Sequence, residues 1–514
     1  MYHQRRSLSS AGPPTLVNFM RIVYNETTNR KGEKAPESRP AQAARANGMI
    51  IAAILLPVLA GAVLPLMKCE NMRQRGIYVE AAAVATSVLA VLAALRGGDA
   101  LSVELLPGLP LALRSDSLSS VFALLVAGLW PLASLYAFAY MEREEWPDRF
   151  FAWYLVSDGV TLCVAFSANL LTLYLSYECL TLSTLPLVNH KDDGPSRRAG
   201  MKYAAWTIGG AALGFVAMAV ALSCGGASSF ARGGILTGNP EILRWVYLLA
   251  FLGFGVKAAV APFSAWLPAA SVAPTPVTAL LHAVAVVNAG AFAVMRVTFD
   301  VFGTAVLYGT FAQTAALAIA CFTILLGAVM AVRERHLKRR LAWSTVSNLS
   351  YMLMGVALMT EAGLEGALTH MVFHGLMKIT LFFGAGAILT QTGKEYIQDI
   401  RGFGKIMPWT CGTFALAAVA LTGIPPLCGF VSKWRLLTAA VNTGLPMGTV
   451  ATVTLIAAAV LTAVYALSPV ISMYFRPLNP ENRELSGKRL DPDARMLIPM
   501  AAIAAMTVVA GLWQ

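Results

Sequence analysis

The chain has 514 residues, of which 57% are hydrophobic and only 13% are charged. A soluble domain cannot cover that much apolar surface, so the composition predicts an all-α polytopic membrane protein embedded in a lipid bilayer. The formal net charge of +12 does not indicate a nucleic-acid partner, because the basic residues stand in short loops between apolar runs.

Residues 1–48 form a polar leader that carries eight Lys and Arg against three Glu. The leader lacks the apolar core of a signal peptide. We interpret it either as a disordered extension or as the product of a mis-assigned start, with translation beginning at Met49. The intact mass of the purified protein would distinguish the two.

Apolar runs long enough to cross about 30 Å of hydrocarbon begin at Met49. They predict fourteen membrane helices, near residues 49–67, 78–95, 117–140, 150–168, 170–189, 201–223, 245–269, 276–298, 311–332, 339–360, 363–390, 406–437, 449–475 and 495–513. We divide the chain into helices 1–3 (49–149), helices 4–8 (150–298), helices 9–13 (299–475), and a last loop with helix 14 (476–514).

Prolines interrupt the seventh and twelfth of these helices. The seventh contains Pro262, and the twelfth contains Pro425 and Pro426. Proline removes a backbone donor and bends a helix, and the freed carbonyls need other partners inside a membrane. Breaks at corresponding places predict two inverted five-helix repeats, helices 4–8 and 9–13, with a functional site beside each break. A lysine stands close to each break, Lys257 in the first and Lys433 in the second.

The distribution of basic residues predicts the orientation in the membrane. Loops after odd-numbered helices hold 22 Lys and Arg, whereas loops after even-numbered helices hold five: Arg96, Arg114, Arg232, Arg244 and Arg296. By the positive-inside rule the odd loops are cytoplasmic and both chain ends face outward. We therefore expect a multi-pass membrane protein with both ends on the outer face.

The cysteines and histidines do not form a metal-ligand pattern. The seven cysteines are scattered without a Cys-x-x-Cys pair. The sequence therefore predicts no metal, iron–sulfur cluster or other cofactor in this chain, and any redox chemistry would belong to a partner.

A small set of ionisable residues remains deep inside the predicted helices. In THMVFHGLMKITLFFGAG, two histidines and a lysine recur every four residues and so share one stripe of a helix. Each deep lysine costs roughly 2.5–3.5 kcal/mol if it is charged at the bilayer centre. The set consists of Glu178, Lys257, His282, His370, His374, Lys378 and Lys433, with Asp158 as a weaker member.

A single buried lysine can merely lock two helices together through a carboxylate. Here the acids are too few to neutralise the lysines pairwise, and imidazole exchanges protons near neutral pH. The set therefore favours a proton relay. Asp158 stays ambiguous at this point, because it suits either a second switch carboxylate or a hydrogen-bonded structural acid.

Several motifs, in order, resemble the antiporter-like membrane subunits shared by respiratory complex I, group 4 membrane-bound hydrogenases and Mrp-type sodium/proton antiporters. LLTLYLSYECLTLSTLPLV resembles the fifth helix of that family, and FGVKAAVAPFSAWLPAASVAPTPVTALLHAVAVV resembles its seventh and eighth. RRLAWSTVSNLSYMLMG, HMVFHGLMKITLFFGAG and GIPPLCGFVSKW resemble its tenth, eleventh and twelfth. The likeness covers nearly everything from Met49 to Gln514.

The resemblance implies a pumping glutamate at Glu178, a pumping lysine at Lys257 and a central histidine at His282. Two departures matter: the glutamate motif reads YECL, and Asn288 stands where hydrogenase- and Mrp-like members often have a lysine. The chain also ends after helix 14, which favours a D-type Mrp or hydrogenase-type member. The implied partners are the other membrane subunits of such a complex, and the implied location is a bacterial or archaeal cell (inner) membrane.

The resulting hypothesis is a proton-translocating subunit. Glu178 stabilises the protonated Lys257, and the proton then passes through His282 and ordered water to the histidine–lysine stripe and to Lys433. Sodium is a second candidate ion, because carboxylates serve either. Three alternatives stay open: a scaffold or passive proton channel, which Asn288 would suit, a stand-alone solute transporter, and a redox enzyme in its own right.

Overall fold

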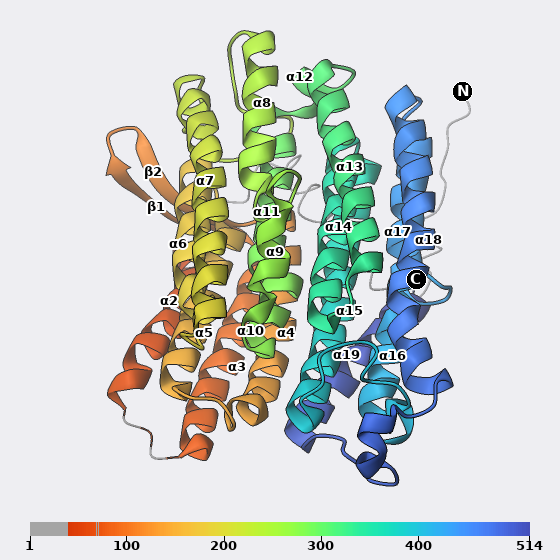
Figure 1. Cartoon of the computed structure of the whole chain (residues 1–514). Helices are drawn as coiled ribbons and strands as arrows, with labels where there is room; N and C mark the ends of the chain where they lie inside the picture. Colours follow the sequence, from red (N-terminus) through yellow and green to blue (C-terminus); the bar gives the residue numbers. More distant parts are fainter. Residues whose placement is uncertain (1–39, 68, 70, 514) are drawn as a thin grey trace, which may run out of the picture.

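The computed structural model describes residues 40–67, 69 and 71–513. Within this part the protein is a bundle of long helices with one β-hairpin beside it (Figure 1). Eleven described helices are long and apolar enough to cross a membrane, so the predicted polytopic all-α fold is confirmed. The leader predicted at residues 1–48 lies outside the described residues apart from 40–48, where the first described helix starts.

The first part of the bundle follows the predicted order closely. Its helices are α2 (Pro40–Val63), α3 (Met72–Arg96), α4 (Ser117–Met141), α5 (Pro147–Phe166), α6 (Leu170–Val188), α7 (Gly194–Ser223), α8 (Pro240–Gly255), α9 (Trp266–Ala269), α10 (Thr275–Ala283) and α11 (Val286–Arg296). Short turns of helix are η1 (Leu64–Leu66), η2 (Phe263–Ala265), η3 (Ala270–Val272) and a π-helical turn, η4 (Val297–Phe302).

The second part contains α12 (Thr304–Leu307), α13 (Phe311–Arg333), α14 (Leu337–Ala357), α15 (Glu361–Thr392), α16 (Pro408–Thr422), α17 (Cys428–Val441), α18 (Pro446–Phe475) and α19 (Ala494–Leu512). The turns η5 (Phe403–Lys405) and η6 (Pro480–Leu485) lie in its connecting loops. The count of fourteen spans and the inverted repeat remain predictions.

Polar residues at helix starts explain where several helices begin. The Asn71 side chain accepts a hydrogen bond from the amide of Gln74 (2.9 Å), which caps α3. Asn169 does the same for α6 (2.8 Å to the amide of Thr172). Each cap supplies an acceptor to a backbone donor that has no partner within its helix.

A hairpin that the apolar runs did not predict connects α3 to α4. Strands β1 (Gly98–Leu106) and β2 (Leu109–Ser115) pair antiparallel, with Gly98 opposite Ser115 and Leu106 opposite Leu109. The amide of Ala168 donates to the carbonyl of Ala112 (2.9 Å), which fixes the hairpin against the start of α6. We call this end of the bundle the hairpin end.

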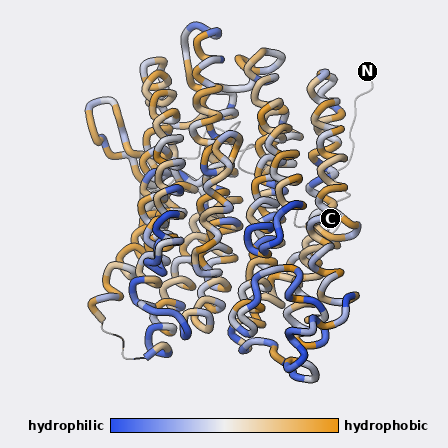
Figure 2. The backbone as a smooth tube through the Cα atoms, viewed as in Figure 1, coloured by the Kyte–Doolittle hydropathy of each residue, from blue (hydrophilic) through white to orange (hydrophobic). Residues whose placement is uncertain are grey.

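The opposite end, the basic end, carries the loops with many basic residues. Figure 2 shows the hydrophilic stretches concentrated toward this lower end, while apolar residues line the lengths of the helices. The loops meet there through ion pairs, Lys191 with Glu144 (3.5 Å) and His336 with Glu395 (3.4 Å).

Two elements form the interior of the bundle. α15 packs against α4, α10, α14, α16, α17 and α19, so protein surrounds it on every side. The segment from α10 through η4 is entirely buried. Residues on these elements therefore face other helices and not lipid.

Three of the predicted helices are discontinuous. The seventh stops at Gly255 and resumes at η2, and the twelfth divides into α16 and α17, as the prolines predicted. The eighth was expected to be continuous over 276–298, and this is wrong, because α10 ends at Ala283 and α11 begins at Val286. No proline lies in that interruption, which left no local signal in the sequence.

Candidate functional site

The first helix break positions Lys257, whose side chain is completely buried. Its ammonium lies 3.9 Å from a carboxylate oxygen of Glu178 on α6. The same ammonium donates to the backbone carbonyl of Tyr177 and lies 3.5 Å from the centre of the Tyr177 ring. Glu178 is partly accessible at the surface of the chain, with 22% of its side chain exposed. The predicted pair of glutamate and lysine is therefore in contact.

Aromatic side chains satisfy the carbonyls that the break leaves free. The Tyr177 hydroxyl donates to the carbonyl of Phe254 (2.7 Å), and the Trp266 indole nitrogen donates to that of Val256 (2.9 Å). An unpaired carbonyl in a membrane interior is costly, so these bonds stabilise the interrupted backbone. The sequence analysis missed Tyr177; its only local signal was its position beside Glu178.

The central break holds the second predicted group. His282 lies in the last turn of α10, is fully buried, and has no hydrogen-bond partner among the described residues. Asn288, on α11, donates from its side-chain amide to the carbonyl of Ala283 (2.8 Å) and so bridges the interruption. Asn288 thus joins the two sides of the break with a short side-chain hydrogen bond, which a longer lysine side chain would not make in the same way.

The stripe on α15 faces this central break. A Cβ atom on Gly375 would lie 3.0 Å from the carbonyl oxygen of Ala283, so glycine allows the close approach of the two elements. His374, the preceding residue, is within electrostatic range of His282, His370 and Lys378. The imidazole rings of His370 and His374 stack with centroids 5.9 Å apart.

The three buried groups of the stripe have different partners. His370 Nδ1 makes a hydrogen bond with the hydroxyl of Ser432 on α17 (2.9 Å). Lys378 donates to the carbonyl of Leu341 (3.0 Å) and to the hydroxyl of Ser344, both on α14. Neither ring nitrogen of His374 has a partner among the described residues. Nε2 of His370 is likewise unpartnered, so His374 has two free ring nitrogens and His370 has one.

Lys433, on α17, lies at the second proline break. It donates to the carbonyls of Leu421 (2.7 Å) and Thr422 (3.3 Å) at the end of α16. The carbonyl end of a helix carries partial negative charge, which favours a cation there. No carboxylate of the described residues pairs with Lys433 or Lys378, in contrast to Lys257.

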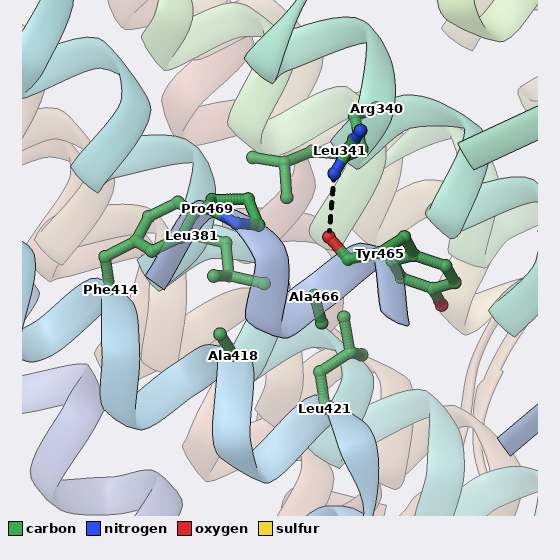
Figure 3. Close-up of a pocket in the computed structure, with 9 residues that line it drawn as sticks. All are labelled: Arg340, Leu341, Leu381, Phe414, Ala418, Leu421, Tyr465, Ala466 and Pro469. Atoms are coloured by element: carbon green, nitrogen blue, oxygen red, sulfur yellow. Dashed lines mark hydrogen bonds between the residues drawn. The ribbon is translucent and has the colours of Figure 1, made fainter. Parts of the chain in front are cut away.

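A small cavity with room for about one water molecule lies among α14, α15, α16 and α18. Leu341 and Leu421, whose carbonyls accept from Lys378 and Lys433, both line it (Figure 3). Arg340 lies at its edge and donates to the carbonyl of Tyr465 (3.3 Å). The remaining lining residues are apolar: Leu381, Phe414, Ala418, Ala466 and Pro469.

The structure therefore arranges the predicted residues in two groups and leaves one apart. Glu178 and Lys257 form the first group, and His282 joins the α15 stripe and Lys433 in the second. Among the described residues no hydrogen bond or ion pair joins Lys257 to His282. Asp158, on α5, belongs to neither group, and it is buried with both carboxylate oxygens unpartnered within the described chain.

Arg296 had been assigned to an outward loop, and this assignment is wrong because η4 continues α11 beyond it. Arg296 is 2% exposed and donates to both carboxylate oxygens of Asp116 (2.6 and 2.8 Å) and to Asp300 (2.8 Å). Arg232 extends the network from Asp300 (3.3 Å) to Glu361 at the start of α15 (2.8 Å). This network ties the hairpin end of the first part to the helix that carries the stripe.

Two family models match the chain. One, described as the membrane part of "NADH:quinone oxidoreductase/Mrp antiporter", matches residues 167–460. The other, described as the N-terminus of chain 5 of NADH-ubiquinone oxidoreductase (complex I), matches residues 108–151. The first match contains every residue of both groups described above.

Individual relatives are subunits of multisubunit complexes. Component B of hydrogenase-4 from Escherichia coli is 34% identical over 63% of this chain and 50% of its own length. Subunit L of the NADH-quinone oxidoreductase from Mycobacterium tuberculosis is 32% identical over 78% of this chain and 62% of its own length. The chain thus spans half to three-fifths of these two relatives. Subunit N from Desulforudis audaxviator is 31% identical over 84% of this chain and 90% of that protein.

Solved structures share the fold. A chain of the Mrp complex from a Dietzia species superposes with a TM-score of 0.80 at 26% identity, covering 90% of this chain and half of that chain. A chain of the membrane-bound sulfane sulfur reductase, an archaeal respiratory membrane complex, superposes with a TM-score of 0.77 at 22% identity. The second match covers 90% of this chain and 94% of the matched reductase chain.

Proposed function

Because the chain belongs to the family of membrane subunits shared by NADH:quinone oxidoreductases and Mrp antiporters, we propose that it moves protons through its buried lysines and histidines. The resemblance inferred from the motifs is confirmed at the level of the family. The identity of the transported ion, the route of the proton and the roles given to residues below are all part of this proposal.

The observation that carries the proposal is the contact between Lys257 and Glu178 at a helix break. The carboxylate, 3.9 Å away, stabilises the protonated lysine. Since Glu178 is partly exposed at the surface of the chain, a neighbouring subunit can change its surroundings. Weakening the pair makes Lys257 release its proton more readily, and each tenfold change in that equilibrium corresponds to about 1.4 kcal/mol.

The released proton then travels toward the second group. We assign His282 and His374 as carriers, because their ring nitrogens have no protein partner in the described chain and can exchange protons with water. Ordered water must bridge Lys257 and His282, since no direct contact joins them. Lys378 and Lys433 follow, each held by backbone carbonyls that suit the protonated form.

Orientation and partners complete the proposal. Loops at the basic end face the cytoplasm, the chain ends face outward, and the driving signal comes from another membrane subunit of the complex. Sodium is the second candidate for the transported ion. The structural use of Asn288 at the central break favours one rival, a scaffold subunit that no longer pumps.

The test is ion uptake by inverted membrane vesicles that contain the whole complex. Lys257→Ala and Lys378→Ala should abolish proton uptake at equal assembly, while Lys488→Ala, in an exposed loop, should leave it unchanged. Uptake that survives both buried changes would refute the relay and support the scaffold. Uptake that requires sodium in the buffer would identify sodium as the coupled ion.

A further inference from the structure

We propose that a second group of buried polar side chains, on α3, α4 and α5, forms a separate proton-holding site that exchanges protons with the basic end. This group, the α5 carboxyl site, consists of Glu80, Tyr154 and Asp158, with Trp130 and Ser134 beside them. The claim that the site holds a proton rests on the burial of its side chains and on their unpartnered polar atoms, whereas a role of the site in transport rests on the proposed function.

Asp158 is the innermost member of the site. Its side chain is 1% exposed, and neither carboxylate oxygen has a hydrogen-bond partner among the described residues. No ion pair of the described chain includes it. An acid kept only for a structural hydrogen bond would have an acceptor or donor in place. An isolated carboxylate in an apolar interior is very costly, so Asp158 must carry a proton or contact water.

Tyr154 lies one helical turn before Asp158 and connects the two acids. It is fully buried, its hydroxyl has no partner in the described residues, and it is within electrostatic range of both Asp158 and Glu80. The Trp130 ring packs against the Tyr154 ring with centroids 5.4 Å apart, and its indole nitrogen is likewise unpartnered. The two packed rings, one from α4 and one from α5, thus each carry an unpartnered polar atom, and Tyr154 lies one helical turn from the buried carboxyl.

Glu80, on α3, is the outer member. It is half-buried, the hydroxyl of Ser134 lies beside it, and its Oε2 atom has no partner among the described residues. No hydrogen bond joins the Tyr154 hydroxyl to either carboxyl in the described chain, so a proton that passes between Glu80 and Asp158 needs water between them. A water molecule that accepts a proton from one acid and donates a proton to the other carboxylate leaves no net change on itself.

The seam between α3 and α5 leads from this site to the basic end. An ion pair between Arg75 and Asp148 joins the first turns of the two helices. At 1.5 Å per residue, Tyr154 lies about 9 Å further along α5 than Asp148, and Asp158 about 6 Å beyond that. Glu80 lies about 7.5 Å along α3 from Arg75 by the same measure. The polar groups therefore lie at increasing depth from the basic end into the bundle.

Two ion pairs near α5 engage charged groups other than Asp158. They are Arg75 with Asp148, and Glu178 with Lys257. The α5 carboxyl site is thus separate from the contact of Glu178 and Lys257. It adds a second place where a proton can enter the buried part of the protein.

The first experiment detects the proton directly. Infrared difference spectra of the complete complex in membranes, recorded on a pH change, report the carbonyl band of protonated carboxyl groups. We expect Asp158→Asn to remove one such band and Glu80→Gln to shift or remove another. Asp148→Asn, at the ion-paired and partly exposed control position, should leave both bands in place. Spectra of Asp158→Asn and Glu80→Gln that match the native spectrum at every pH would overturn the site.

A transport measurement on the same variants tests the use of the site. Asp158→Asn, Glu80→Gln and Tyr154→Phe should each lower proton uptake at equal assembly, and Tyr154→Phe keeps the packing if a carboxyl variant fails to fold. A band that responds to sodium at constant pH, and not to pH, would overturn proton binding. If Lys257→Ala and Lys378→Ala leave uptake intact while Asp158→Asn still removes its band, the relay fails and the α5 carboxyl site stands.

Discussion

The Lys257 ammonium and the Glu178 carboxylate lie 3.9 Å apart, and they form the one direct ion pair between deep ionisable groups of the candidate site in the described chain. The pair bridges a buried helix break and a partly exposed position on α6. A change outside the chain can therefore reach a charge inside it through a single contact. The other buried lysines are held by neutral carbonyls and hydroxyls, so they lack this external control.

Removing the charge of Glu178 should have the same effect as removing Lys257. We expect Glu178→Gln to lower proton uptake by roughly a hundredfold, within the range that positioned acid–base groups contribute. Because the two residues act as a pair, Glu178→Gln combined with Lys257→Ala should be little worse than either change alone. Uptake in vesicles at equal assembly measures this, with Glu484→Gln in an exposed loop as the control. Additive losses would show that the residues act independently.

Lys433 allows a separation of charge from proton release. Lys433→Arg keeps a cation and donors for the carbonyls of Leu421 and Thr422, but a guanidinium does not deprotonate in proteins. We expect this variant to assemble normally and to transport poorly. Lys433→Ala removes the donors and should also destabilise the second break by about 1–3 kcal/mol. Thermal unfolding of the purified complex and vesicle uptake report the two effects.

Normal transport in Lys433→Arg would contradict a proton-carrying role. It would leave Lys433 as a structural cation at the carbonyl end of α16.

The sequence predicted the polytopic helical fold because membrane spans need long apolar runs, and it located the deep charges because such residues are rare in those runs. It could not predict the break after Ala283, since the local sequence HAVAVV contains no proline or glycine. Two contacts meet at that break: the local bond from the Asn288 amide to the Ala283 carbonyl, and the long-range approach of Gly375 on α15.

Long-range pairing explains the other misses. Arg296 pairs with Asp116, which lies 180 residues earlier in the chain, and no local sequence pattern indicates such a distant partner. In the sequence, Tyr177 stood out only as the neighbour of Glu178. In the structure its carbonyl and ring contact Lys257, and its hydroxyl donates to the backbone at the same helix break. Asp158 was left open between two roles, and its unpartnered oxygens now weigh against the structural one.

The ion network at the hairpin end should contribute stability that persists at moderately acidic pH. Burial alone would raise the pKa of the Asp116 carboxyl, but the Arg296 guanidinium holds it well below the usual range. A carboxyl with a lowered folded-state pKa stabilises the protein above its unfolded pKa of about 4, and this stability is lost only as pH falls through the folded value.

We therefore expect Asp116→Asn, which retains a helix-capping side chain, to destabilise the protein by about 1.5–3 kcal/mol at both pH 8 and pH 5. Thermal unfolding of the solubilised protein at the two pH values measures it. Glu104→Gln on the exposed hairpin is the control and should change little. A penalty that disappears between pH 8 and pH 5 would show that Asp116 is not held ionised by Arg296.

Gly290 tests whether the exact position of Lys257 matters to transport. A Cβ atom there would lie 2.4 Å from the amide nitrogen of Ala258 and 2.9 Å from the Cβ atom of Lys257. Because backbone atoms cannot yield as a flexible side chain can, Gly290→Ala should push the break away from α11 and change the distance from Lys257 to Glu178. We expect reduced uptake together with a lower unfolding temperature.

The matched control is Gly209→Ala in α7, where an added Cβ meets nothing within 4 Å. Alanine is favoured over glycine in helices by about 0.5–1 kcal/mol, so this variant should be neutral or slightly more stable. The informative comparison is between the two alanines, since both add one methyl group to a helical glycine. Equal uptake in both variants would mean that transport tolerates a displaced Lys257, and the geometry of the first break would then no longer support its role as the point of control.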